Sequence, residues 1–299
     1  MNGTRIMVIG SSNTDMTVKT VKLPKPGETV LGGESLMGAG GKGANQAVAA
    51  CRLGTDVTFF CKVGQDLFGN QAIAHYETEG LDASLIKRSD KPSGIALITV
   101  DESGENCIVV APGANNDITP ADIDAIADDI KKSSILLMQL EIPVPAVLRA
   151  AQIAYEAGVY TVLNPAPACQ LPDEIFRYIK LLVPNRTETA TLTGVDPHDE
   201  ESLHKAVGML KSKGVEDVVV TLGSEGSAIF KDGEVTVVPA KKVKAEDTTA
   251  AGDTFCAGIC VGLSEGKTLA EAVEFATAAA AITVTRMGAQ SSIPFRNEL

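Results

Sequence analysis

The 299-residue sequence has no tryptophan and three histidines, and aromatic residues make up only 4% of it. Positive charge is also scarce, because 26 Lys and Arg stand against 38 Asp and Glu and leave a formal net charge of -12. Nucleic acids and anionic membranes attract clustered positive charge, so we expect neither as a partner. An anionic substrate would instead need backbone dipoles, a few local cations or a metal ion.

Paired cysteines and long apolar runs are missing as well. The six cysteines show no CxxC pair, which favours buried free thiols over a zinc site or a disulfide framework. The longest apolar stretch, 276–284, is too short and too interrupted to cross a bilayer. The first residues lead directly into a strand-like run. We therefore expect a cytoplasmic protein with a large buried core.

Strand-like and helical segments alternate along most of the chain. Short, almost wholly apolar runs at 6–10, 135–140 and 218–221 are typical of parallel strands that are covered on both faces. Helical patterns such as 44–53 and 145–157 separate them and end at glycines. A further helical pattern is capped by Thr119 and Pro120 and continues to Lys132. This alternation predicts an α/β fold: one domain over 1–299, with three α/β/α layers and a mostly parallel central sheet.

Two parts of the chain interrupt this alternation. Segments 17–23 and 28–37 are β-like with no helix between them, and 94–100 and 106–111 form a hairpin pattern. We expect these parts, at about 14–37 and 93–111, to form a small β-sheet lid that projects from the main body. The remainder contains no repeat and no linker, so a second domain is not expected.

Polar residues follow most of the predicted strands. In a parallel sheet the carboxyl ends of the strands share one edge, so these residues should line a single cleft. The group comprises Asn13, Asp15, Glu141, Asn164, Asn185, Glu188, Thr221, Gly223, Ser224 and Asp253. Any one of them alone could be an ordinary turn residue.

Residues 247–255, Asp-Thr-Thr-Ala-Ala-Gly-Asp-Thr-Phe, lead into an apolar helical stretch. Small residues at a helix start leave the first N–H groups accessible to phosphate oxygens. Asp253 lies inside this anion site although a carboxylate repels anions, which indicates a second role. We expect it to be the general base toward an attacking hydroxyl. The motif alone leaves open an ordinary helix N-terminus with a favourably placed aspartate.

The glycine-rich segment 38–43 resembles two nucleotide-binding motifs without satisfying either. It matches GxGxxG, but no acidic residue follows about twenty positions later, as a Rossmann site requires. It contains a Gly-Lys pair, but Gly43 stands where a P-loop has Ser or Thr. We predict instead a flexible loop through which the backbone approaches a small ligand, with Asn45 pointing toward that ligand.

Two long segments then indicate a family. Residues 40–47, Gly-Gly-Lys-Gly-Ala-Asn-Gln-Ala, and residues 247–255 resemble the two signatures of the ribokinase-like family of sugar and nucleoside kinases. Shorter matches lie at 164–167, 184–188 and 221–226 in the family's order, and the resemblance extends over 6–294. It implies ATP-dependent phosphorylation of D-ribose at the 5-hydroxyl, giving D-ribose 5-phosphate and ADP. Alternatives are a kinase for 2-deoxyribose, fructose or a nucleoside, and a catalytically inactive sugar sensor.

The resemblance also implies roles for individual residues. Asp253 would be the general base, beside an anion hole formed by the N–H groups of Ala251, Gly252 and Asp253. The sugar would be held by Asn13, Asp15, Gly41, Lys42, Asn45, Glu141 and Asp253. The nucleotide would be bound by Asn185, Thr221, Gly223, Ser224, Gly226, Gly252 and Thr277.

Two metal ions and a second subunit are implied in the same way. Asn185 and Glu188 would organise Mg2+, mostly through water, and the lids of two subunits would join in a homodimer. A monovalent cation, usually K+, would be surrounded by Asp247, Thr249, Thr283, Arg286, Gly288 and Ser292. The chain departs from the family pattern at Ala250, where many members have glycine, and its end at Leu299 leaves the last helix in doubt.

Overall fold

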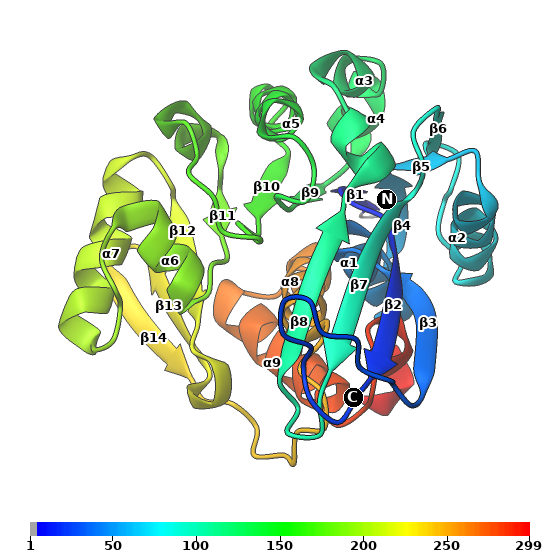
Figure 1. The fold of residues 1–299 in the computed structure, drawn as a ribbon. Helices are drawn as coiled ribbons and strands as arrows, with labels where there is room; N and C mark the ends of the chain where they lie inside the picture. The colour runs from blue at the N-terminus through cyan, green and yellow to red at the C-terminus, as the bar shows by residue number, and fades with distance from the viewer. Residues whose placement is uncertain (1–4) are drawn as a thin grey trace.

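The computed structural model describes residues 5–299, and its centre is an eight-stranded sheet in the order β14-β13-β12-β11-β10-β9-β1-β4 (Figure 1). The six parallel strands are β1 (Arg5–Ile9), β4 (Asp56–Phe60), β9 (Ile135–Met138), β10 (Tyr160–Leu163), β11 (Leu181–Leu182) and β12 (Asp217–Thr221). An antiparallel hairpin, β13 (Ser227–Lys231) and β14 (Glu234–Val238), completes one edge. The predicted mostly parallel sheet is therefore confirmed.

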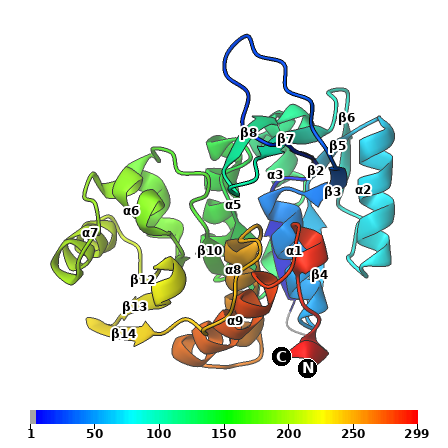
Figure 2. The same cartoon turned by 60° about the horizontal axis from the view of Figure 1, so that its bottom comes forward.

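Helices cover both faces of this sheet. Strand β1 shows why, because Ile6 and Val8 face one apolar core while Met7 and Ile9 face the other. The first core is covered by α1 (Lys42–Arg52), α2 (Leu67–Thr78), α8 (Ala251–Ser264) and α9 (Leu269–Thr283), of which α1, α8 and α9 lie side by side in Figure 2. The second is covered by α3 (Pro120–Asp124), α4 (Ala127–Lys132), α5 (Val144–Glu156) and α7 (Glu200–Ser212), while α6 (Arg186–Thr193) packs against α7. The three-layer α/β/α prediction is confirmed.

One predicted helix is divided in two. The pattern at 119–132 indicated a continuous helix, and its start at the capping box of Thr119 is confirmed. The structure has α3 and α4 instead, with a break at Ile126, whose backbone is not helical. The break leaves Ile123, Ile126 and Ile130 all buried in the same core. A continuous helix would also place these three residues on one face, so their burial does not explain the break.

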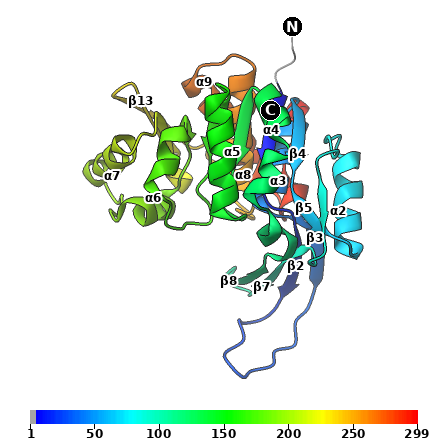
Figure 3. The same cartoon turned by 90° about the horizontal axis from the view of Figure 1, so that it is seen from above.

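A separate four-stranded sheet stands apart from the main body in Figure 3. It consists of β2 (Asn13–Lys19), β3 (Ser35–Gly40), β7 (Gly94–Val100) and β8 (Asn106–Ala111), in the order β3-β2-β7-β8. The hairpin has the expected bounds, but the first two strands lie earlier and later than the predicted 17–23 and 28–37. The intervening segment 20–34 contains two prolines and Gly27 at φ 80°, and it has no strand. A two-stranded parallel sheet, β5 (Lys62–Gly64) with β6 (Lys87–Ser89), lies nearby.

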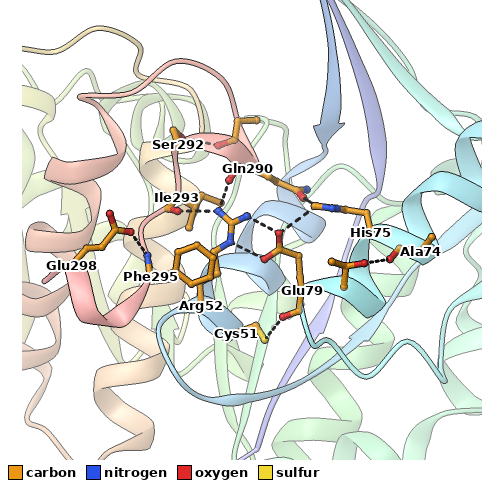
Figure 4. A network of polar contacts seen from close by, with 12 residues as sticks. Cys51, Arg52, Ala74, His75, Glu79, Gln290, Ser292, Ile293, Phe295 and Glu298 are labelled. Carbon is orange, nitrogen blue, oxygen red and sulfur yellow. Dashed lines mark hydrogen bonds and ion pairs between the residues drawn. The ribbon is translucent and has the colours of Figure 1, made fainter.

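After α9 the described chain continues to Leu299 in short turns. Those turns are η4 (Gln290–Ser292) and η5 (Arg296–Glu298), and similar turns occur at η1 (Gly113–Asp117), η2 (Asp173–Tyr178) and η3 (Gly223–Glu225). Arg52 at the end of α1 holds this segment, because its Nη1 donates to the carbonyls of Gln290 at 2.6 Å and Ile293 at 2.9 Å (Figure 4). The rest of its guanidinium pairs with Glu79 of α2 at 2.6 and 2.7 Å.

Two sequence-level expectations concern thiols and membranes. All six cysteines are free, and Cys61, Cys256 and Cys260 are buried, as expected for core thiols. Over the described range 5–299, no helix combines the length and apolarity needed to cross a membrane.

Candidate active site

A cleft of about 1330 Å³ lies between the carboxyl ends of the central strands and the small sheet. It brings together many of the residues predicted from sequence: Asn13, Asp15, Gly41, Lys42, Asn45, Glu141, Asn185, Glu188, Thr221, Asp247, Thr249, Gly252, Asp253 and Gly288. The other predicted residues do not line it: Gly223, Ser224, Gly226, Ala251, Thr277, Thr283, Arg286 and Ser292. Of the ten polar residues expected at the strand ends, eight, including Asn164, line this cleft, and Gly223 and Ser224 do not.

Two side chains at the start of the small sheet are held in defined orientations. The Oδ1 atom of Asn13 accepts a hydrogen bond from Nδ2 of Asn115 at 2.7 Å, which leaves Nδ2 of Asn13 as the donor for a ligand. Asp15 lies next to Gly40, where a Cβ would come within 2.1 Å of the Asp15 carboxylate. Glycine at position 40 thus makes room for this carboxylate at the cleft.

The Asp15 carboxylate lies in an unfavourable environment for a charge. Burial first, and then the nearby carboxylates of Glu141 and Asp253, raise its pKa from 3.8 to about 6. Three acidic groups therefore share one cleft. A ligand that donates hydrogen bonds to Asp15 would favour its ionised form, as sugar hydroxyls do.

The turn from β3 into α1 is tight, so the prediction of a flexible loop at 38–43 is wrong. β3 ends at Gly40 and α1 begins at Lys42, with Gly41 at φ 90° between them. A Cβ on Gly43 would come within 2.4 Å of the backbone nitrogen of Ser11. These glycines allow α1 to pack directly on the chain that leaves β1.

Glu141 fixes the start of α1 from the opposite side of the cleft. Its Oε2 accepts hydrogen bonds from the Ser11 hydroxyl at 2.5 Å and from the backbone N–H of Lys42 at 3.0 Å. The Lys42 side chain is half-buried among acidic groups, and its pKa is raised by Asp253 first and by Glu141 and Glu188 as well. Its single positive charge therefore offsets only part of the negative charge of these side chains.

The first turn of α8 leaves two backbone N–H groups open. The N–H of Ala251 donates to the carbonyl of Thr248 at 3.2 Å, whereas within residues 5–299 those of Gly252 and Asp253 have no backbone acceptor. A Cβ added to Gly252 would meet no atom within 4 Å, so open space lies outside these groups. The anion site can therefore use the N–H groups of Gly252 and Asp253, while the Ala251 N–H already has a partner.

The Asp253 carboxylate is buried beside this anion site. Its Oδ2 accepts a hydrogen bond from Nδ2 of Asn45 at 3.0 Å, and its Oδ1 accepts one from Nε2 of Gln46 at 3.0 Å. Within residues 5–299 the Oδ1 atom of Asn45 has no partner, and it is buried at the cleft, so it can accept a bond from a ligand hydroxyl. The base predicted from sequence is thus oriented by two neighbouring amides of α1.

The pair Asn185 and Glu188 begins α6 as a reciprocal cap. The Oδ1 atom of Asn185 accepts from the N–H of Glu188 at 2.7 Å, and the Glu188 carboxylate accepts from the N–H and Nδ2 of Asn185 at 2.8 and 2.9 Å. Burial raises the pKa of Glu188, against the lowering effect of the Asn185 hydrogen bond. Asn185 and Glu188 both line the cleft, so the Glu188 carboxylate that caps α6 would also be available to a ligand.

The predicted nucleotide-binding loop is the turn from β12 to β13. Thr221 pairs with Asn185 in a parallel bridge, which brings these two predicted residues together. Gly223 adopts φ 63° in exposed η3, whereas a Cβ on Gly226 would come within 2.1 Å of the Val238 carbonyl oxygen. Thr277 lies half-buried in α9, outside the cleft lining, with its hydroxyl donating to the Val273 carbonyl.

The predicted monovalent-cation residues come from two segments joined by Asp247. Its Oδ1 accepts from the N–H and hydroxyl of Thr249 at 2.8 and 2.6 Å, and its Oδ2 accepts from the N–H of Gly288 at 2.9 Å. The side chains of the remaining three members are bonded elsewhere. Thr283 donates to Thr254, Arg286 pairs with Glu298, and Ser292 donates to the Ala289 carbonyl.

Sequence reasoning missed several buried polar residues behind the cleft. Gln46 and Gln139 lie behind Asp253, and Asn115 holds Asn13 and the backbone of Ser12. Gln46 was visible within the segment 40–47, but its neighbours along the chain gave no indication of its partners. Asn115 lies in η1, about a hundred residues from the strand that it supports.

Comparisons with known proteins agree with this arrangement. Residues 3–296 match the pfkB family of carbohydrate kinases. The ribokinase of Haemophilus influenzae is 45% identical over 294 residues, which cover 98% of this chain and 96% of that protein. The solved ribokinase structure from Thermotoga maritima is 41% identical with a TM-score of 0.90, covering 98% and 97% of the two chains. An Arabidopsis thaliana ribokinase complexed with ribose and ATP is 33% identical with a TM-score of 0.90, covering 99% and 97%.

Proposed function

The chain belongs to the pfkB family of carbohydrate kinases, and from this premise we propose that it is a ribokinase, which transfers the terminal phosphoryl group of ATP to the 5-hydroxyl of D-ribose. The products are D-ribose 5-phosphate and ADP. The single observation that carries the mechanism is the Asp253 carboxylate, which lies in the cleft beside the open N–H groups at the start of α8. A base and an anion site at one point are what phosphoryl transfer to an alcohol requires.

The sugar subsite combines acceptors and donors in the way that ring hydroxyls need. Asp15 offers a carboxylate, Asn45 an unpaired carbonyl oxygen and Asn13 an amide donor, while Gly41, Lys42 and Glu141 complete the lining. A site built to bind a hydroxyl rejects a substrate that lacks it, because its buried polar groups are then unpaired. This supports ribose over 2-deoxyribose, and kinases for fructose or a nucleoside remain the alternatives.

The reaction follows from positions already described. Asp253 accepts the proton of the 5-hydroxyl, while Gln46 and Asn45 hold its carboxylate. The N–H groups of Gly252 and Asp253 stabilise the charge that spreads over the transferring phosphoryl oxygens. Because this transition state is loose, alignment of the two substrates supplies most of the acceleration.

The nucleotide would lie along the ends of β11 and β12. Asn185 and Thr221 lie together at the cleft, and Gly223, Ser224 and Gly226 continue around the exposed turn. Thr277, outside the cleft lining, would reach only the far end of the nucleotide. The terminal phosphate then lies toward Gly252 and the sugar.

Magnesium fits this donor set, with Asn185 and Glu188 as the residues that would organise it. The described part of the chain has no cluster of three or more His, Cys, Asp and Glu side chains arranged for a metal ion. Mg2+ keeps several waters and takes phosphate oxygens readily, so one buried carboxylate suffices. When bound, the ion would neutralise charge on the nucleotide phosphates.

Potassium also fits, at the junction of the two segments that Asp247 joins. Carbonyl oxygens suit this ion, and Thr249, Thr283, Arg286, Gly288 and Ser292 would supply them with Asp247. The junction leads directly into the anion site, since residues 248–250 form the turn before α8. A cation there would add positive charge behind the phosphoryl group.

A homodimer joined through the β lid is supported by the small sheet. All six residues of its edge strand β8 are exposed, with Ile108 at 51% and Val109 at 62%. Apolar edge strands are normally covered because they bind other strands. We expect light scattering to give twice the chain mass, and Val109→Lys to give the monomer mass.

We also place the protein in the cytoplasm, where ATP is available.

The activity is tested by measuring ADP release over ribose, 2-deoxyribose, fructose and a nucleoside, with and without K+. We expect ribose to give the highest kcat/KM and Asp253→Asn to bind both substrates but lose about 10²–10⁴ in kcat. Asp199→Asn is the matched control, because Asp199 is an exposed helix cap that asparagine replaces equally well. Binding of sugar without ADP release by the parent would favour the sensor, and near-normal turnover by Asp253→Asn would remove the base from the mechanism.

A further inference from the structure

A chain of three buried amide side chains leads from the main body of the protein to Asp253. Gln46 donates through Nε2 to Oδ1 of Asp253 at 3.0 Å and to Oδ1 of Asn164 at 3.2 Å. Its Oε1 accepts from Nε2 of Gln139. Asn164 in turn donates through Nδ2 to the backbone carbonyl of Val183 at 3.0 Å.

We propose that Gln46 is a positioning residue, whose orientation the fold fixes so that an N–H always faces the Asp253 carboxylate. The proposal rests on the proposed role of Asp253 as general base. Its consequence is that Oδ1 of Asp253 keeps the Gln46 donor, while Oδ2 accepts from Asn45, which lines the cleft.

The orientation of the chain is set at a backbone group. The Val183 carbonyl can only accept, so the Asn164 amide must present Nδ2 to it and Oδ1 to Gln46. Gln46 must therefore direct Nε2 toward both Asn164 and Asp253. If the Gln46 amide were rotated by half a turn, its Oε1 would face Oδ1 of Asn164 and Oδ1 of Asp253, and both contacts would be repulsive. The donor is thus in place before any substrate binds.

The groups that fix the orientation of Gln46 follow three neighbouring strands of the parallel sheet. Gln139 follows β9, Asn164 follows β10 and Val183 follows β11, and these strands are adjacent in the sheet order. Gln139 fits because Gly10 has no side chain; a Cβ at that position would come within 2.0 Å of the Gln139 Oε1. Within residues 5–299 this Gln139 oxygen is buried without a hydrogen-bond partner. The series of amides therefore leaves one acceptor unpaired at Gln139, while Gln46 still donates to Asp253.

A fixed donor has two effects on a carboxylate base. It favours the ionised form, because a hydrogen bond to a carboxylate stabilises the charge. It also removes rotation of the carboxylate, and misplacement of a reacting group by about 1 Å can cost about 10²-fold in rate. Neither effect involves contact with the sugar or the nucleotide.

The test replaces Gln46 by methionine, which has similar length and no donor. We expect kcat to fall about 10- to 100-fold with both KM values nearly unchanged. We also expect the acid limb of the kcat profile to move to higher pH by about one unit. A role confined to stability would lower the melting temperature but leave the acid limb and the kcat of the folded enzyme unchanged, and that result would overturn the proposal.

Other ionisable groups around Asp253 could also shape this profile. They are Lys42 of α1, Asp15 of β2, Glu188 of α6, Cys256 of α8 and, beyond them, Glu141 after β9. All of them are retained in the variant, so the difference between variant and parent profiles isolates the Gln46 donor.

Two further variants keep the test decisive. Val207→Ala removes buried volume from α7, remote from the cleft, and we expect it to lower stability with an unchanged profile. Gln46→Glu keeps the side-chain shape and places a second carboxylate on Asp253, so it should move the acid limb further than methionine does. If the methionine variant does not fold, an unshifted profile for Gln46→Glu overturns the proposal.

Asp253→Asn separates this inference from the proposed function. If Asp253→Asn keeps normal turnover, the base assignment fails. If it loses turnover while Gln46→Met keeps the parent kcat and acid limb, the base stands and the positioning role fails. In the Asp253→Asn background, Gln46→Met should change kcat by less than about threefold, because a residue that acts through another has no separate effect.

Discussion

A methyl group added at Gly252 tests the anion site without disturbing the fold. The residue lies in the first turn of α8, and a Cβ built there meets no atom within 4 Å. Alanine is favoured over glycine in helices by up to about 1 kcal/mol. We therefore expect Gly252→Ala to be as stable as the parent, or more stable by up to about 1 kcal/mol.

The same methyl should strongly impair catalysis. A phosphate oxygen must come within about 2.9 Å of the nitrogen of Gly252 or Asp253 to accept its hydrogen bond, and the methyl would occupy that approach. Loss of one such donor costs about 2.7–4 kcal/mol of transition-state stabilisation, or about 10²–10³ in kcat. The KM for ribose should change little, because apart from Asp253 the proposed sugar residues lie on β2, at the start of α1 and after β9.

Gly208 provides the matched control. It lies in α7, and a Cβ there also meets no atom within 4 Å. Gly208→Ala should therefore show the gain in stability with unchanged activity. Unfolding is best followed by far-UV circular dichroism, because the chain has no tryptophan. A Gly252→Ala enzyme whose kcat stays within about threefold of the parent would refute an anion site at this turn.

Three further predictions concern the ion pair, the sugar carboxylate and backbone strain. Arg52→Met should lower the unfolding free energy by about 3–5 kcal/mol, because it leaves Glu79 charged at 12% exposure; urea unfolding should show partial recovery in Arg52→Met/Glu79→Met. The KM for ribose should rise as the pH falls below about 6, because protonated Asp15 loses acceptor capacity; Asp15→Asn should have weak binding without this pH dependence. Ala250→Gly should melt at the same or higher temperature, since φ of 61° costs alanine about 1–2 kcal/mol and glycine's entropy offsets part of it.

The cleft could be predicted because its residues occupy equivalent positions along the chain. Polar groups after apolar strands, such as Asn13, Asn164 and Asn185, must meet once those strands are parallel. The anion site expected at the start of α8 could be predicted in the same way, since small residues before an apolar helix indicate open N–H groups. Both inferences use only local patterns and one rule of sheet topology.

The errors arise where distant parts of the chain determine local structure. β2 begins at Asn13 because it pairs with β7, about eighty residues later, and no local pattern gives that register. The glycines at 38–43 indicated flexibility, but Gly43 serves a backbone contact with Ser11. The partners of Gln46 lie at Gln139 and Asn164, so its role was not visible from residues 40–47 alone.

The charge balance of the cleft supports the proposal that backbone groups hold the phosphate. The one lysine of the sugar subsite, Lys42, has its pKa raised by Asp253, Glu141 and Glu188, so its charge is already engaged by carboxylates. In a chain of net charge -12, a transferring phosphoryl group meets a cleft whose side chains are negative on balance. Within residues 5–299 the N–H groups of Gly252 and Asp253 have no backbone acceptor, and they lie at the positive end of α8. In the proposed mechanism the backbone would therefore stabilise the phosphoryl charge beside any Mg2+ on the nucleotide, and this would allow an aspartate to act as base at the same point.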